Sequence, residues 1–133
     1  MNIEGMYQEV LLDAYRNPKN KGRLQKYDLE AKDVNPACGD KVNIQAKVEN
    51  GRIKEIKFEG EGCIICMASA SMLTEYIKGK KLHEVKNVQK EEALKLIPIT
   101  LSPLRIKCGL LPLKVVKLGI YTYLGEKNHE SDF

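Results

Sequence analysis

The sequence predicts an α+β fold: a small three-stranded antiparallel sheet with helices packed on one face, plus an N-terminal helix. Two observations predict this fold. Residues 41–62 alternate apolar and polar side chains around a single Asn-Gly pair, and the flanking segments repeat apolar residues at helical spacing. A chain of 133 residues has the size of one domain. We therefore expect residues 1–125 to form a single domain and residues 126–133 a disordered tail.

The N-terminal helix is predicted over residues 2–16, and Asn17-Pro18 is a signal that ends it. Its apolar side chains fall on one stripe: Ile3, Met6, Tyr7, Val10, Leu11 and Ala14. The hairpin over residues 41–62 has a two-residue turn at Asn50-Gly51, which suits type I′. Residues 27–34 supply the candidate third strand, which is about the minimum for an independently stable sheet.

Helical spacing returns after the hairpin, and it predicts the remaining elements in order. A helix is expected over residues 63–78, followed by two short helices over 81–85 and 89–97. The last helix is expected over residues 102–124. Pro112 lies inside this segment, so it should kink the helix or begin its regular part.

The overall composition is that of an ordinary globular protein, with 43% hydrophobic and 30% charged residues. The first twenty residues lack the apolar core of a secretory signal, and no apolar run approaches the ~20 residues that span a bilayer. The net charge of +4 is mild, and aromatic residues do not interleave with the basic stretch between Arg16 and Lys26. We expect a soluble, cytoplasmic protein that binds neither nucleic acid nor membranes.

Cysteines carry the strongest functional signal. Without an export signal, disulfides are not expected, and clustered cysteines then more often bind metal or perform chemistry. Cys38 precedes the hairpin and Cys63 follows it, so the two ends of the hairpin should bring them together. Asp40 lies two positions after Cys38, and Cys108 lies near the start of the last helix, where it could swing over the same edge. Three sulfurs and one carboxylate suit zinc or an iron–sulfur cluster.

Cys66 forms a Cys-x-x-Cys pair with Cys63 and allows three interpretations. It could be a redox partner, a fourth ligand, or a small buried hydrophobe. The residue lies on the apolar stripe of the predicted helix with Ala70 and Leu73, and a thioredoxin-like βαβ pattern is missing. We favour the buried residue.

Three segments resemble the cysteine motifs of the U-type iron–sulfur cluster scaffold family, which includes IscU, SufU and the amino-terminal part of NifU. They are "NPACGD", "GEGCIICMASASM" and "SPLRIKC", and they occur in the family's order and spacing. The resemblance implies a scaffold, rather than a turnover enzyme, that receives sulfur from a cysteine desulfurase and iron from a donor. Such a scaffold builds a transient 2Fe–2S cluster and passes it to apo acceptor proteins.

The same resemblance assigns roles to residues. Cys38, Cys63 and Cys108 match the family's ligand positions, with Asp40 as the labile fourth partner, and Cys108 matches the cysteine that accepts persulfide sulfur. Lys107 replaces the histidine of IscU, as in SufU. Its ammonium could lower the pKa of the Cys108 thiol, or it could be only solvated charge on a helix face. Zinc could occupy the same four residues, so a zinc-dependent sulfurtransferase partner of a desulfurase, as in SufU, is the alternative function.

Two departures bear on these expectations. The segment "LSPLR" resembles the sequence that Hsp70-type chaperones bind in IscU, but Ser102 replaces its first proline and the last two positions differ, which makes chaperone dependence doubtful. The short interval between Cys63 and Cys108 resembles IscU, whereas Lys107 resembles SufU. The sequence does not decide between iron–sulfur and zinc, nor does it give the oligomeric state.

Overall fold

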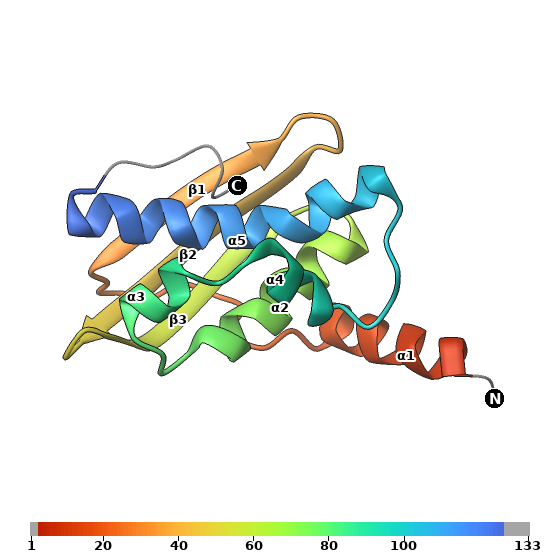
Figure 1. The fold of residues 1–133 in the computed structure, drawn as a ribbon, viewed down its shortest axis with the longest axis horizontal. Coiled ribbons are helices and arrows are strands. Elements are labelled where there is room, and N and C mark those ends of the chain that lie inside the picture. Colours follow the sequence, from red (N-terminus) through yellow and green to blue (C-terminus); the bar gives the residue numbers. More distant parts are fainter. Residues whose placement is uncertain (1–2, 127–133) are drawn as a thin grey trace.

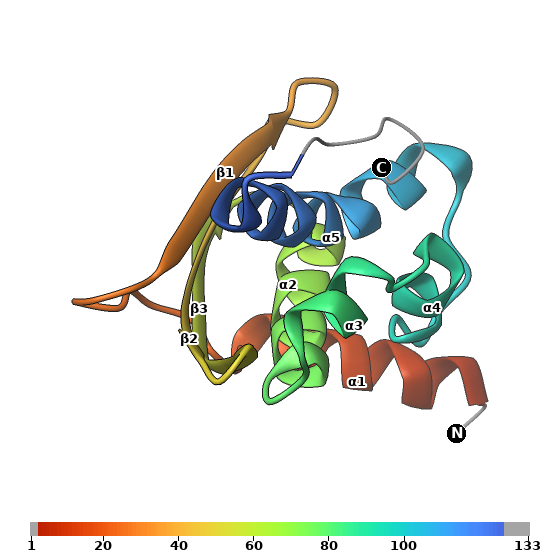
Figure 2. The ribbon, with the colours of Figure 1, turned by 60° about the vertical axis from the view of Figure 1, so that its left-hand side comes forward.

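The computed structural model describes residues 3–126 and confirms the α+β prediction. Three strands form one antiparallel sheet in the order β1-β2-β3 (Figure 1). Helices α2 and α5 cover one face of this sheet, which Figure 2 shows nearly edge-on. No helix among the described residues is both long and apolar enough to cross a bilayer.

The hairpin consists of β2 (Asp40–Glu49) and β3 (Arg52–Glu61), joined at the predicted turn. Asn50 and Gly51 both have positive φ, 54° and 72°, as a type I′ turn requires. A register shift between Lys47 and Val48 explains why the alternation of the sequence is broken once. The third strand, β1 (Leu29–Asn35), begins slightly later than predicted and pairs along β2.

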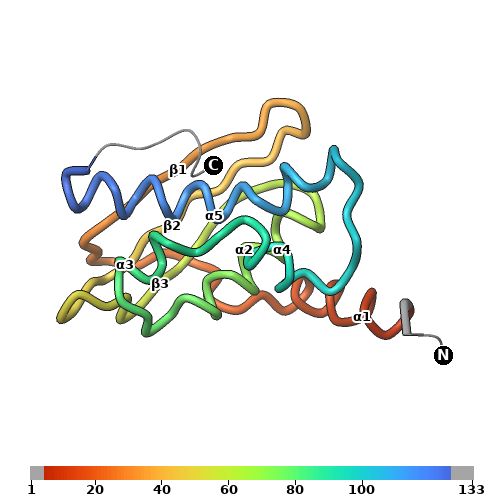
Figure 3. Tube along the Cα trace, in the orientation of Figure 1, coloured from red at the N-terminus to blue at the C-terminus, as the bar shows by residue number. Residues whose placement is uncertain are grey.

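The core lies between the sheet and two helices, α2 (Ile64–Ile77) and α5 (Pro103–Leu124). Figure 3 shows β1 and α5 running side by side although two strands and three helices separate them along the chain. The buried side chains at the centre come from alternate strand positions and from the inner faces of both helices: Val42, Ile44, Ile56, Phe58, Leu73, Ile77, Val115 and Ile120.

The N-terminal helix α1 (Ile3–Arg16) packs against α2, but most of its predicted apolar stripe stays exposed. Leu11 is buried, whereas Met6, Tyr7 and Val10 are 54%, 49% and 53% exposed. The stripe was predicted from spacing alone. It is only partly covered because α1 lies at the edge of the helical layer rather than over the sheet (Figure 1).

Two short helices, α3 (Leu82–Lys86) and α4 (Lys90–Lys95), connect α2 to α5. Pro112 lies inside α5, and the first turns of α5 are bent away from the line of the remaining turns (Figures 1 and 3). Proline has no N–H to donate to the carbonyl four residues earlier, which is that of Cys108. Of the predicted C-terminal tail, only Glu126 is described, and residues 127–133 lie outside the described residues.

Candidate metal centre

Cys38 lies in a tight turn that is fixed by backbone hydrogen bonds. The carbonyl of Asn35, the last residue of β1, accepts from the N–H of Cys38 at 3.2 Å and from that of Gly39 at 2.8 Å. Gly39 has a φ of 73°, which L-residues adopt only with strain, so glycine suits this position. Asp40 follows as the first residue of β2, and its side chain is fully buried.

The Asp40 carboxylate ties the two ends of the hairpin together. Its Oδ1 accepts from the backbone N–H of Cys63 at 2.9 Å, and the Cys63 thiol lies 3.9 Å from Oδ2. A Cβ on Gly62 would lie 2.5 Å from Oδ1, so glycine is needed there for the carboxylate to approach. The meeting of the hairpin ends, which strand pairing predicts, is therefore reinforced by a hydrogen bond to a buried side chain.

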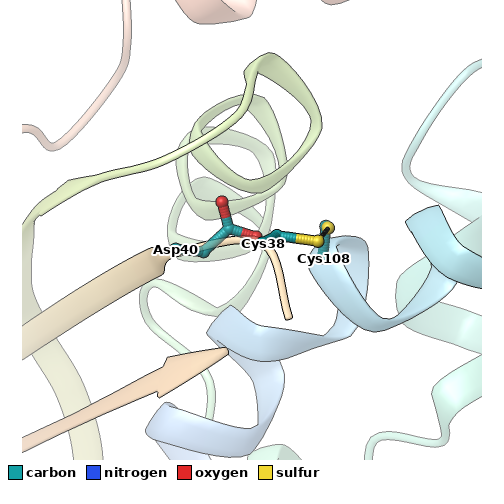
Figure 4. Close-up of side chains that lie close together, drawn as sticks. All are labelled: Cys38, Asp40 and Cys108. Atoms are coloured by element: carbon teal, nitrogen blue, oxygen red, sulfur yellow. Dashed lines mark hydrogen bonds between the residues drawn. The ribbon is translucent and has the colours of Figure 1, made fainter. Parts of the chain in front are cut away.

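Cys108 reaches the same place from α5. Its thiol donates to the Sγ of Cys38 at 3.2 Å, and ligand atoms of Cys38, Asp40 and Cys108 all lie within 4.8 Å of one another (Figure 4). Cys63 is not part of this compact group, although it borders Asp40. The structure thus brings together the four predicted ligands, with Cys63 at the margin of the group.

The Cys-x-x-Cys pair has a structural explanation. Cys63 is the N-cap of α2, and its Sγ accepts from the backbone N–H of Cys66 at 3.4 Å. Three positions is the spacing of an N-cap and the residue that it caps. The Cys66 side chain instead enters the main core and is 0% exposed. The Cys63 sulfur therefore lies beside the site, whereas the Cys66 sulfur lies in the core, as the interpretation of Cys66 as a buried hydrophobe predicts.

Burial dominates the electrostatics of the inner thiols. It raises the pKa of Cys108, and hydrogen bonds to Cys38, Asp40 and Cys63 raise it further. Burial also raises the pKa of Cys66, with smaller contributions from the charges of Asp40 and Cys63. A metal ion would have to displace the Cys108 proton, so its binding should release protons and weaken as the pH falls.

Arg105 is a site residue that the sequence analysis missed. Interaction with the charge of Cys63 and a hydrogen bond to Cys108 raise the pKa of the Arg105 guanidinium. Arg105 and Cys108 are three positions apart on one helix, a spacing that places side chains on the same face. That spacing could have revealed the residue.

Lys107 was considered for thiol activation in the sequence analysis, with plain solvated charge as the alternative. It is exposed and borders a hollow of about 260 Å³ with Pro36 and Lys114. The pKa of Cys108 is raised rather than lowered, through burial and through hydrogen bonds to Cys38, Asp40 and Cys63. Ser102, in the place of the family's first proline, is the N-cap of α5 and accepts from the Arg105 N–H at 3.4 Å.

The donor set fits a metal ion. Two thiols and a buried carboxylate lie with their ligand atoms within 4.8 Å of one another, and a third thiol lies beside the carboxylate. Thiolates with one harder oxygen suit Zn²⁺ or iron in a tetrahedral site. A carboxylate binds soft iron less firmly than a fourth thiolate would, and this weaker bond would ease release of the bound iron.

Comparison with known proteins places this geometry in context. The sequence profile described as "NifU-like N terminal domain" matches residues 6–130. The zinc-dependent sulfurtransferase SufU of Bacillus subtilis is 36% identical over 137 residues, covering 90% of this chain and 92% of that protein. The iron–sulfur cluster assembly scaffold protein IscU of Haemophilus influenzae is 39% identical over 124 residues, covering 88% and 94%. The crystal structure of a NifU-like protein (N-terminal) from Brucella abortus has the same fold, with a TM-score of 0.79 and 19% identity, over 94% of this chain and 99% of that one.

Proposed function

Because the chain belongs to the family of NifU-like N-terminal domains, which the U-type scaffolds share, we propose that it is an iron–sulfur cluster assembly scaffold. It receives sulfur from a cysteine desulfurase and iron from a donor, builds a 2Fe–2S cluster and transfers it to apo acceptor proteins. The observation that carries this proposal is the convergence of Cys38, Asp40 and Cys108, with Cys63 beside them.

In this proposal each ligand has a distinct structural setting. Cys38 sits in a preorganised turn, Cys63 caps a helix, and Cys108 lies where Pro112 weakens the hydrogen bonding of α5. Asp40 is the ligand that keeps the cluster transferable, because its oxygen binds iron less firmly than a thiolate does. Cys108 accepts the persulfide sulfur, and Arg105 compensates the negative charge of the thiolates.

A second function, zinc-dependent sulfur transfer, is supported by the similarity to SufU over most of both chains. The same four residues would hold Zn²⁺, and Cys108 would leave the metal to take sulfur from the desulfurase. The two functions differ in whether iron and sulfide accumulate on the protein.

The test begins with anaerobic purification and quantification of iron, zinc and acid-labile sulfide, together with a visible spectrum. The protein is then incubated with desulfurase, cysteine and ferrous iron. We expect a cluster spectrum that survives Cys66→Ser and lasts longer in Asp40→Ala. Tightly bound zinc without a cluster under any condition, together with desulfurase turnover stimulated through Cys108, would refute the scaffold and favour sulfur transfer.

A further inference from the structure

The contact between Cys38 and Cys108 brings together two thiols that lie 70 residues apart. Their Sγ atoms are 3.2 Å apart, and Figure 4 shows the two sulfurs adjacent, with the Asp40 carboxylate beside Cys38. A disulfide requires about 2.05 Å between the sulfurs, so roughly 1 Å of movement separates this arrangement from a covalent bond. Both cysteines are free in the structure.

We propose that Cys38 resolves a persulfide on Cys108, so that the metal-free site reduces sulfane sulfur to sulfide with its own two thiols. This inference rests on the proposed function, because the persulfide is the product of sulfur delivery to Cys108. The step makes Cys38 a resolving nucleophile in addition to a ligand.

The step balances without any other reductant. The Cys38 thiolate attacks the inner Sγ of the Cys108 persulfide, a Cys38–Cys108 disulfide forms, the bond to the outer sulfur breaks, and hydrosulfide leaves. The outer sulfur gains two electrons and becomes sulfide, while the two cysteine sulfurs lose two electrons and become the disulfide. An external thiol must later reduce that disulfide.

Neither of the other cysteines is as well placed for this attack. The Cys63 sulfur accepts the Cys66 N–H and lies outside the compact group. Cys66 is fully buried in the core, where burial raises the pKa of its thiol. The Cys38 sulfur lies 3.2 Å from that of Cys108. Cys63 also forms a hydrogen bond to Cys108, but it lies outside the compact group.

Two local features allow the small movement that bond formation needs. Pro112 leaves the Cys108 carbonyl without its helical N–H partner, so the turn that carries Cys108 is held less firmly. On the opposite side, the turn that carries Cys38 is fixed by two hydrogen bonds to the Asn35 carbonyl. Cys108 can therefore move toward a fixed partner. A metal held by Cys38 would occupy this nucleophile, so the step belongs to the metal-free protein.

The experiment uses the full chain, stripped of metal and handled without oxygen and without any added thiol except the cysteine substrate. It is mixed with a purified cysteine desulfurase and one equivalent of cysteine, then quenched with acid. Intact mass distinguishes a persulfide, which adds one sulfur, from a disulfide, which removes two hydrogens, and free sulfide is measured in parallel. Peptide mapping locates each modification. The variants are Cys38→Ser, Cys38→Ala and, as a matched control, Cys66→Ser.

We expect wild type and Cys66→Ser to yield a Cys38–Cys108 disulfide with an equal amount of sulfide. Both Cys38 variants should retain the persulfide on Cys108 and release at least about tenfold less sulfide, since exchange requires a thiolate. A persulfide that persists in wild type, or that moves to Cys38 without sulfide release, would overturn the inference and leave the proposed function standing.

A second sulfur source separates the two failures. If no variant takes sulfur from the desulfurase, the proposed function fails, and the protein is treated with glutathione persulfide instead. Disulfide and sulfide that form in wild type but not in the Cys38 variants would then still support the resolving role. Their absence in wild type would overturn it.

Discussion

The two cysteines of the Cys-x-x-Cys pair can be tested against each other, because Cys63 borders the metal site whereas Cys66 is buried in the core. Cys66→Ser places a hydroxyl in the main core at a position that is 0% exposed. A buried hydroxyl without a good partner costs about 1–3 kcal/mol. Cys66→Ala removes one buried heavy atom and should cost about 1 kcal/mol, as deletion of one methylene does. Neither change touches the metal ligands, so metal content should not fall.

Cys63→Ser should have the reverse effect. Serine is among the preferred N-cap residues, and its oxygen can accept the Cys66 N–H in place of the sulfur. The free energy of unfolding of the metal-free protein should therefore stay within about 1 kcal/mol of wild type or rise. A thiolate ligand is lost, however, so zinc or iron bound per chain should decrease.

The assay is equilibrium unfolding in urea of the metal-free proteins, followed by metal analysis of the same preparations after loading with Zn²⁺. Cys66→Ala serves as the matched control, because it deletes the sulfur without adding a polar group. The reasoning would be refuted if Cys66→Ser lost metal at unchanged stability while Cys63→Ser retained it. The Cys66 sulfur would then be a ligand rather than a core atom.

Three further predictions concern residues around the site and on the sheet. Arg105→Ala should weaken Zn²⁺ binding several-fold in competition with a chromophoric chelator, because the guanidinium interacts with the charge of Cys63 and hydrogen-bonds to Cys108. Lys107→Ala, at an exposed position, should leave the affinity unchanged. Gly62→Ala should destabilise the metal-free protein by about 1–3 kcal/mol in urea unfolding, because the new Cβ displaces the Asp40 carboxylate from its buried hydrogen bond. The pKa of Glu30 is lowered, chiefly by a hydrogen bond that the buried Gln45 donates to its carboxylate. The ionised form of Glu30 therefore stabilises the fold above the unfolded pKa of about 4.3, and this stabilisation is lost as the pH falls through the lower pKa of the folded state. Glu30→Gln should reduce the dependence of the unfolding free energy on pH between these two pKa values.

Each of these predictions has a result that would contradict it. Equal zinc affinities for the Arg105 and Lys107 variants would remove Arg105 from the site. Unchanged stability of Gly62→Ala would mean that the Asp40 hydrogen bond contributes little. A Glu30→Gln variant with the same acid profile as wild type would place that part of the acid sensitivity in other carboxylates.

Local sequence determined the elements and the approximate place of the site. The alternation of residues 41–62 and the Asn50-Gly51 pair suffice for the hairpin, because the period of two and a turn with positive φ are set by neighbouring residues. A hairpin returns to its starting point, so Cys38 and Cys63 had to lie near each other. The burial of Cys66 followed equally from its place on an apolar stripe.

Tertiary structure decided which groups touch. The rotation of α5 about its own axis is set by the packing of many side chains against the sheet. That rotation directs Cys108 to Cys38, brings Arg105 to the thiols and leaves Lys107 exposed. The same holds for α1, whose apolar spacing could not reveal that its neighbours cover only part of it. Periodicity reports which residues share a face, whereas what covers that face depends on contacts between segments far apart in the chain.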